Sequence, residues 1–279
     1  MIQYDPKSWW GLIFKFHKSD TFRKLLSAMF TVALYAGGVV YLNQEILFDL
    51  FRGTSLVHSL LGFVISLLLV FRTNTAYERW WEGRRQWGSL VNASRNLALK
   101  LNAWLPAAHP MRTLVAEGIA EFAAVLKSHL RDSKHASLED PIQHSPNRVA
   151  ARLWQLSENL RRGGEIGREQ FLTLSVELTT LTDVCGACER IRRTPIPYSY
   201  SLFIKKFIFV YIVTMPFCFA HDFGYWTVLF NTFVFYVLAS LELIAEEVEN
   251  PFGEDANDLP TDEIAETIRR NVWEIMIRP

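Results

Sequence analysis

The segment TSLVHSLLGFVISLLLVF, residues 54–71, contains no charged residue and no proline. It continues directly into RTNTAYERWWE, residues 72–82, where charged side chains recur every few positions. A helix needs about 20 mainly apolar residues to cross the hydrocarbon core of a bilayer, so the first segment is long enough to span. Charged side chains need water or protein around them. Because no helix breaker separates the two segments, we expect one helix that leaves the membrane as a rigid rod.

Three further apolar segments pass the same length test. The sequence therefore predicts four membrane spans, at about residues 25–43, 55–72, 204–220 and 226–246. Only the short segment HDFGY, residues 221–225, separates the last two spans, so these are expected to form a helical hairpin.

The positions of the basic residues predict the orientation of the spans. Arg52 is the only basic residue between the first two spans, whereas the N-terminal segment carries Lys15, Lys18, Arg23 and Lys24. Lys and Arg concentrate in the short loops on the cytoplasmic side of a membrane. Both termini are therefore expected in the cytoplasm, and the chain is expected to be a multi-pass protein of the cell membrane, the inner membrane in a bacterium.

The composition fits a protein that is part membrane and part soluble. Hydrophobic residues make up 50% and charged residues 21% of the chain, and the mean hydropathy is +0.09. Twenty-nine basic residues balance 29 acidic ones, so the basic excess of a nucleic-acid-binding protein is absent. The pair Cys185 and Cys188 lacks the other ligands of a zinc site and the βαβ setting of a redox motif, and we expect it to pack in the core.

The region 73–200 is too long to be a loop and is predicted to be a helical bundle built on extensions of the membrane helices. With the C-terminal segment 247–279 it is expected to complete a single all-α domain over residues 1–279. Apolar residues recur there at helical spacing of three and four over residues 111–130, 147–160 and 168–192.

One stripe of large apolar residues stands out in the second span. Phe63, Leu67 and Phe71 are spaced by four, which keeps them on one face of a helix with about 3.6 residues per turn. In a single subunit such a stripe packs against lipid or neighbouring helices. If several subunits surrounded an axis, the stripe would form stacked apolar rings, and a narrow apolar ring gates ions by dewetting. Both interpretations stay open from periodicity alone.

Several short motifs occur together in one known family. RWW at 79–81 begins eight residues after Phe71, CG at 185–186 precedes IP at 196–197, and NPFGED occupies 250–255, just after the last predicted span. In this order they resemble the bestrophin channels, and the bacterial branch in particular. The resemblance covers nearly the whole chain, and NPFGED is its most specific part.

The resemblance implies a homopentamer with one axial pore, a hydrophobic neck and a water-filled cytosolic vestibule. By matched position the neck residues are Phe63, Leu67 and Phe71, and a second constriction falls near Ile191 or Thr194. Animal members pass chloride and other anions, whereas characterised bacterial relatives are cation-selective. The closer match to the bacterial branch implies that monovalent cations permeate, with a chloride channel as the alternative.

The acidic segment after the last span is a candidate calcium site. In animal bestrophins the corresponding stretch clasps Ca²⁺, and Asn250, Asp255 and Asp258 match ligand positions of the kind that Ca²⁺ takes. Here Ala256-Asn257 interrupts the acidic run, and the bacterial branch resembles a calcium-independent design. We therefore expect no bound cofactor, and a solvated acidic turn in which residues 262–263 stabilise the start of the final helix.

Two other classes of function compete with a channel. An enzyme acting within the membrane needs a nucleophile with a base, or a metal cluster, and the candidate side chains His58, Ser59, Ser66 and His221 are scattered without a companion motif. We therefore expect no enzyme. A non-conducting membrane scaffold or sensor stays open, because a stripe that seals a pore and one that packs a core have the same sequence pattern.

Overall fold

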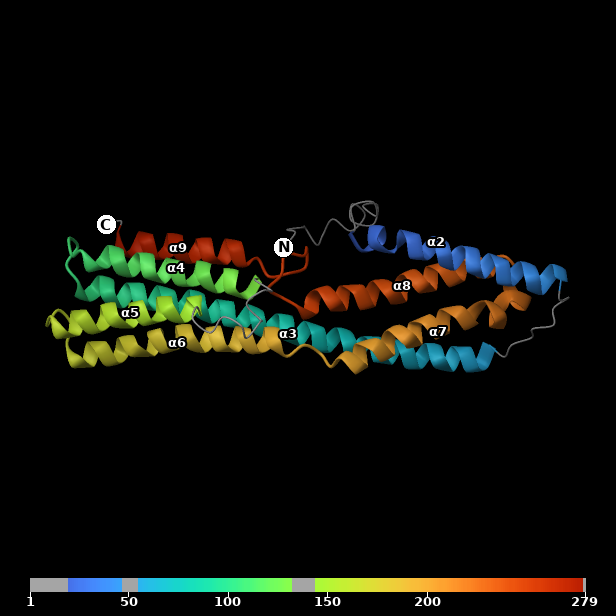
Figure 1. Ribbon diagram of the computed structural model, residues 1–279, viewed down its shortest axis with the longest axis horizontal. Helices are drawn as coiled ribbons and strands as arrows, with labels where there is room; N and C mark the ends of the chain where they lie inside the picture. The colour runs from blue at the N-terminus through green and yellow to red at the C-terminus, as the bar shows by residue number, and fades with distance from the viewer. Residues whose placement is uncertain (1–19, 47–54, 132–143, 278–279) are drawn as a thin grey trace. The chain divides into compact units, whose positions relative to one another are not determined.

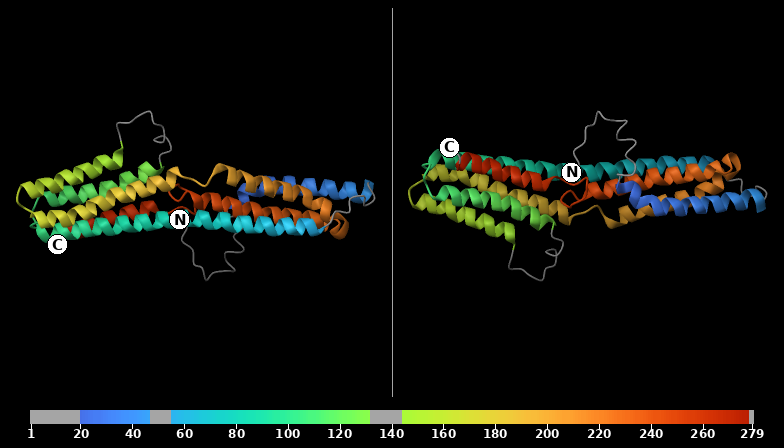
Figure 2. Two further views of the ribbon diagram at one scale, coloured as in Figure 1. Left: turned by 90° about the horizontal axis from the view of Figure 1, so that it is seen from below. Right: turned by 90° about the horizontal axis from the view of Figure 1, so that it is seen from above.

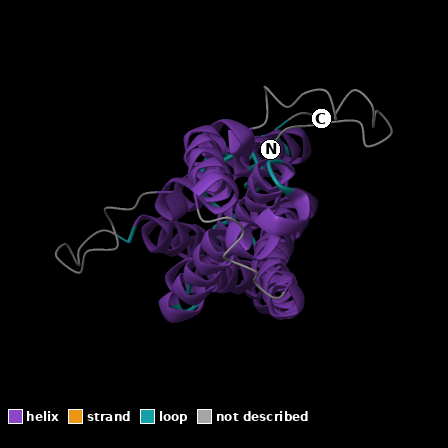
Figure 3. Cartoon of the chain, turned by 90° about the vertical axis from the view of Figure 1, so that its right-hand side faces the viewer, coloured by secondary structure: helices purple, strands orange, loops and turns teal. Residues whose placement is uncertain are grey.

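The computed structural model describes residues 20–46, 55–131 and 144–277, and in these ranges the regular elements are all helices (Figure 3). The expected all-α class is confirmed. The chain divides into two compact units. The span unit contains the described residues up to Glu78 together with residues 195–249, and the bundle unit contains the described residues of 79–194 and 250–277. Whether the two units act as one channel domain stays a prediction.

The span unit is built from four helices. They are α2 (Asp20–Tyr41), which continues into a short π-helix, η2 (Leu42–Ile46), the first part of α3 (Ser55–Trp104), α7 (Tyr198–Phe223) and α8 (Trp226–Glu249). Ile65 and Leu69 of α3 pack against isoleucines of α7 and against Leu238 of α8. This core packs α7 and α8 against one side of α3.

The expected hairpin between the last two spans is confirmed. Helices α7 and α8 lie side by side (Figures 1 and 2), and Gly224 turns the chain between them with a positive φ of 53°. A Cβ atom there would lie 2.9 Å from Nε2 of Gln44. The positive φ favours glycine at this turn, and a larger residue would also have to displace the Gln44 amide.

The bundle unit packs the second part of α3 with four more helices. These are α4 (Met111–Arg131), α5 (Ser145–Arg162), α6 (Arg168–Arg193) and α9 (Thr261–Met276), with α4 between α9 and α5 and with α6 beside α5 (Figure 1). Its core includes Trp87, Phe122 and Phe252. Cys185 and Cys188 are both buried in that core, so their predicted packing role is confirmed.

Helix α3 runs without a break from Ser55 to Trp104, as the uninterrupted sequence predicts. Five described helices are long and apolar enough to cross a membrane: four coincide with the predicted spans, and the fifth is α6. The number of spans therefore stays a prediction. Lys15, Lys18 and Arg52, on which the predicted orientation depends, lie outside the described residues.

Candidate functional site

The apolar stripe of α3 points away from the core of its own span unit. Phe63, Leu67 and Phe71 are 67%, 46% and 56% exposed in the described chain, whereas Ile65 and Leu69 are 1% and 2% exposed. Each residue advances a helix by about 100°, so the two sets lie on opposite faces of α3. The stripe does not serve to pack its own subunit, and its partner is lipid, water or another copy of the chain.

Close contacts with α7 fix the buried face of α3. The imidazole of His58 stacks on the ring of Tyr211 with the centroids 4.0 Å apart, and a Cβ atom on Gly62 would lie 2.7 Å from the Tyr211 hydroxyl. Further along, the Tyr200 hydroxyl donates to the backbone oxygen of Leu68 at 3.4 Å. Because these contacts recur along several turns, α3 has little freedom to rotate about its axis.

A buried arginine holds the same face at the end of the stripe. Arg72 follows Phe71 directly, and its Nη2 lies 2.8 Å from Oε2 of Glu249 while its Nε lies 3.5 Å from Oε2 of Glu242. Arg72 and Glu242 are both buried. Buried charges are tolerated when they are paired, so this group ties α3 to α8. Sequence reasoning missed the pairing, although each charge stands at the border of an apolar segment, which was a usable signal.

The two candidates for the second constriction differ in exposure. The side chain of Ile191 is buried in the bundle core, whereas Thr194, just beyond the end of α6, is exposed. The guanidinium of Arg79 donates to both backbone oxygens. Only Thr194 presents its side chain at the surface of this chain.

The motifs that are far apart in sequence meet within the bundle unit. The indole N–H of Trp80, in RWW, donates to the backbone oxygen of Asn257 at 3.0 Å. A Cβ atom on Gly83 would lie 3.2 Å from Phe252 and from Pro251, both in NPFGED, and Phe252 is fully buried. These motifs therefore form a packing contact between α3 and the turn before α9.

The acidic turn is held by its own protein groups. The Asp258 carboxylate is buried and accepts the backbone N–H of Asp255 at 2.6 Å, and a Cβ atom on Gly253 would lie 2.7 Å from the same oxygen. The adjoining hollow, of about 190 Å³, is also lined by Arg131, which is positively charged. Four acidic residues line the same hollow, Glu254, Asp255, Asp258 and Asp262, and the positive charge of Arg131 beside them opposes the binding of a cation. The expectation that this turn binds no calcium stays a prediction.

The first turn of α9 is tied to α4. Asp262 accepts from Nζ of Lys127 at 2.8 Å and from Nη2 of Arg131 at 2.6 Å. These hydrogen bonds, from Arg131 and then Lys127, hold the pKa of Asp262 at about 2. Asp262 lies in the first turn of α9, as predicted, and its carboxylate also accepts hydrogen bonds from side chains of α4.

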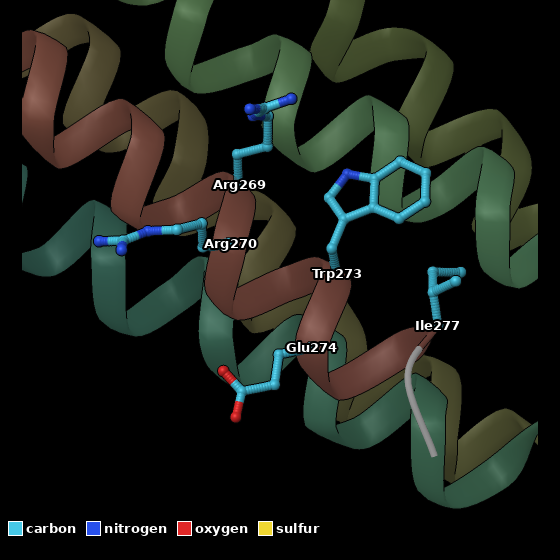
Figure 4. Close-up of a pocket in the computed structure, with 5 residues that line it drawn as sticks. All are labelled: Arg269, Arg270, Trp273, Glu274 and Ile277. Carbon is cyan, nitrogen blue, oxygen red and sulfur yellow. The ribbon is translucent and has the colours of Figure 1, made fainter.

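A surface hollow of about 490 Å³ lies on α9. Its lining side chains point in different directions and do not converge on a common point (Figure 4), and Arg269 pairs with Glu266 of the same helix. The hollow offers no constellation for chemistry. It is lined by Arg269, Arg270, Trp273, Glu274 and Ile277.

Comparison with known proteins identifies the family. The model of the bacterial and fungal bestrophin proteins matches residues 1–274. The chain belongs to the bestrophin family. It is 37% identical to a voltage-dependent anion channel-forming protein of Nostoc, over 75% of this chain and 73% of the relative. It is 32% identical to YneE of Escherichia coli K12, which carries the same description, over 96% and 91% of the two chains.

A solved bestrophin has the same architecture. The crystal structure of a bacterial bestrophin homologue from Klebsiella pneumoniae superposes with a TM-score of 0.81 at 28% identity, covering 90% of this chain and 98% of that one. The family and the descriptions of the relatives support an ion channel in a membrane rather than an enzyme, and the resemblance drawn from the motifs is confirmed.

The buried arginine of this bestrophin gives a direct test of the span unit. Replacing Arg72 by leucine leaves Glu242 and Glu249 without their buried cation, so we expect the free energy of unfolding to fall by about 3–5 kcal/mol. In the control, Lys205→Leu removes an exposed partner of Glu246, and the expected loss is below about 1 kcal/mol. Unfolding of the detergent-purified protein, followed by tryptophan fluorescence, measures both. Equal losses in the two variants would contradict the anchoring role.

Proposed function

We propose that five copies of this chain assemble around one axis and conduct small monovalent ions passively, with the stripe Phe63, Leu67 and Phe71 as the hydrophobic neck. The observation that carries the proposal is the orientation of α3: its apolar stripe is exposed while its opposite face is locked to α7 and α8. A ring of such side chains forms a narrow passage that ions cross only when it is wetted.

The character of the α3 face beyond the neck supports a pore. On the same face, Asn74 and Glu78 follow Phe71 and are exposed, so the surface changes from apolar to polar along the proposed direction of permeation. The span unit exposes other large apolar side chains that can face lipid, among them Phe30 of α2 and Phe233 of α8. The chain thus has separate surfaces for lipid and for an axis.

The proposal includes four spans, both termini in the cytoplasm of a cell, a helical bundle that forms the vestibule, and a second constriction near Ile191 or Thr194. The buried residues of α6 belong to the bundle core, which supports a place for this helix outside the membrane. The exposed side chain favours Thr194 over Ile191. We propose no calcium cofactor, since the acidic turn is held by Asp258 and the backbone.

The permeant ion is either a cation or an anion. We propose monovalent cations, because the first charged residue on the stripe face beyond the neck is Glu78, whose carboxylate would attract them. The second candidate is an anion channel, which the descriptions of the relatives favour. The neck side chains carry no charge and do not decide between the two.

Widening the neck should increase the current. Leu67→Ala shortens all the side chains of one of the stacked rings, so we expect a larger single-channel conductance in planar bilayers than for the unsubstituted protein. Leu229→Ala, on an exposed position of α8, is the matched control and should leave the conductance unchanged. If protein that is verified as a pentamer carries no current in bilayers, a scaffold or sensor is favoured instead. If the protein is a monomer in detergent, it has no axial pore.

Reversal potentials under a NaCl gradient test the sign of the ion. We expect a shift toward the sodium equilibrium potential, and a smaller shift for Glu78→Gln because the attracting charge is lost. A shift toward the chloride equilibrium potential would reject cation selectivity and support the second candidate.

A further inference from the structure

Two histidines and one glutamate from three segments of the bundle unit meet at one point. His129 lies near the end of α4, His144 directly precedes α5, and Glu189 lies on α6. Nε2 of His129 and Nε2 of His144 are each 2.6 Å from Oε1 of Glu189, and the two rings are 4.7 Å apart at their centroids. Among the described residues this is the one group of three metal-ligating side chains whose ligand atoms lie within 4.8 Å of one another.

This donor set has the chemistry of a transition-metal site. Two imidazole nitrogens and one carboxylate oxygen are a ligand set of zinc sites that keep a fourth position for water. Bonds of about 2.0–2.2 Å place tetrahedral ligands roughly 3.3–3.5 Å apart, so the side chains need to separate only slightly. We propose that His129, His144 and Glu189 form a binding site for Zn²⁺ or a similar divalent transition-metal ion. The site goes beyond the proposed channel function and does not depend on it.

The surroundings of the cluster suit an ion that arrives from water. The side chains of His129, Glu189 and His144 are 10%, 19% and 31% exposed, so the site is sheltered and still reachable. Arg192 donates to the backbone oxygen of His129 at 2.7 Å and steadies the end of α4.

Metal binding changes one hydrogen bond of α5. The Nδ1 atom of His144 accepts the backbone N–H of Asn147 at 3.2 Å and so caps the helix. A neutral His144 then carries its proton on Nε2, where it faces Glu189. Zinc at Nε2 moves that proton to Nδ1, and the Asn147 amide loses its acceptor. The metal therefore replaces a cap bond with a link between α4, α5 and α6.

The chain contains a second histidine–glutamate pair, His109 with Glu165, which resembles the cluster but lacks a second imidazole. Nε2 of His109 lies 3.0 Å from Oε1 of Glu165, and Nδ1 of His109 accepts the backbone N–H of Met111 at 3.2 Å. This pair has the same hydrogen-bonding pattern as His144 with Glu189 but supplies only two ligands. This pair serves as a control, because it tests whether one histidine in contact with one glutamate is enough to bind zinc.

The test is a ZnCl₂ titration of the full-length protein in detergent after treatment with a chelator. We expect one high-affinity Zn²⁺ per chain, no competition by Mg²⁺ or Ca²⁺, which prefer oxygen ligands, and a higher unfolding temperature with zinc. His144→Asn keeps an N-cap acceptor and removes a ligand, and Glu189→Gln removes the charge. Each should weaken zinc binding by more than the about 10- to 100-fold that the loss of an outer-shell partner costs and abolish the zinc-induced thermal shift, whereas His109→Ala should leave both unchanged.

Two results would overturn the site. If His144→Asn and Glu189→Gln bind zinc as tightly as the unsubstituted chain, the ion lies elsewhere, for example on the thiols. If His109→Ala weakens binding as much as His144→Asn, the zinc binding is not specific to the cluster. The thermal midpoint without zinc shows that each variant is folded, so a loss of binding is attributed to the missing ligand.

Discussion

The buried charge of Arg72 is the constraint on which the span unit depends. An arginine in an apolar core is stable only while its partners stay in reach, and Glu242 and Glu249 are both on α8. Turning α3 by one residue, about 100°, would carry Arg72 away from both carboxylates and bring Phe71 toward the core. The ion group therefore selects one rotation of α3, and that rotation leaves the apolar stripe exposed.

The contacts with α7 also fix the rotation of α3 about its axis. Gly62 allows the Tyr211 hydroxyl to approach the backbone of α3, and His58 covers the Tyr211 ring. Close packing of this kind tolerates little displacement, so the position of the stripe is set from the opposite face of the helix. The neck residues are therefore positioned by His58, Gly62 and Tyr211, which lie on the opposite side of α3 from the proposed pore.

The local sequence was sufficient for the features that depend on neighbours along the chain. It predicted the unbroken helix from Ser55, the hairpin around Gly224 and the single face shared by Phe63, Leu67 and Phe71. It could not predict which distant charges pair, so Arg72 with Glu242 was missed, as was the meeting of His129 with Glu189. It also could not separate Ile191 from Thr194, because burial depends on how α6 packs. RWW and NPFGED identified the family, yet in the structure they form a packing contact, and the stripe proposed to carry function has no motif.

Two cysteines on opposite faces of α3 would show directly which face lines a pore. In a background with Cys218→Ser, Leu67→Cys and Ile65→Cys are reconstituted in planar bilayers and exposed to a membrane-impermeant thiol reagent. We expect the reagent to alter the current of Leu67→Cys and to leave that of Ile65→Cys unchanged. Modification of Ile65→Cys alone, or of neither variant in a conducting channel, would contradict a pore lined by the exposed stripe.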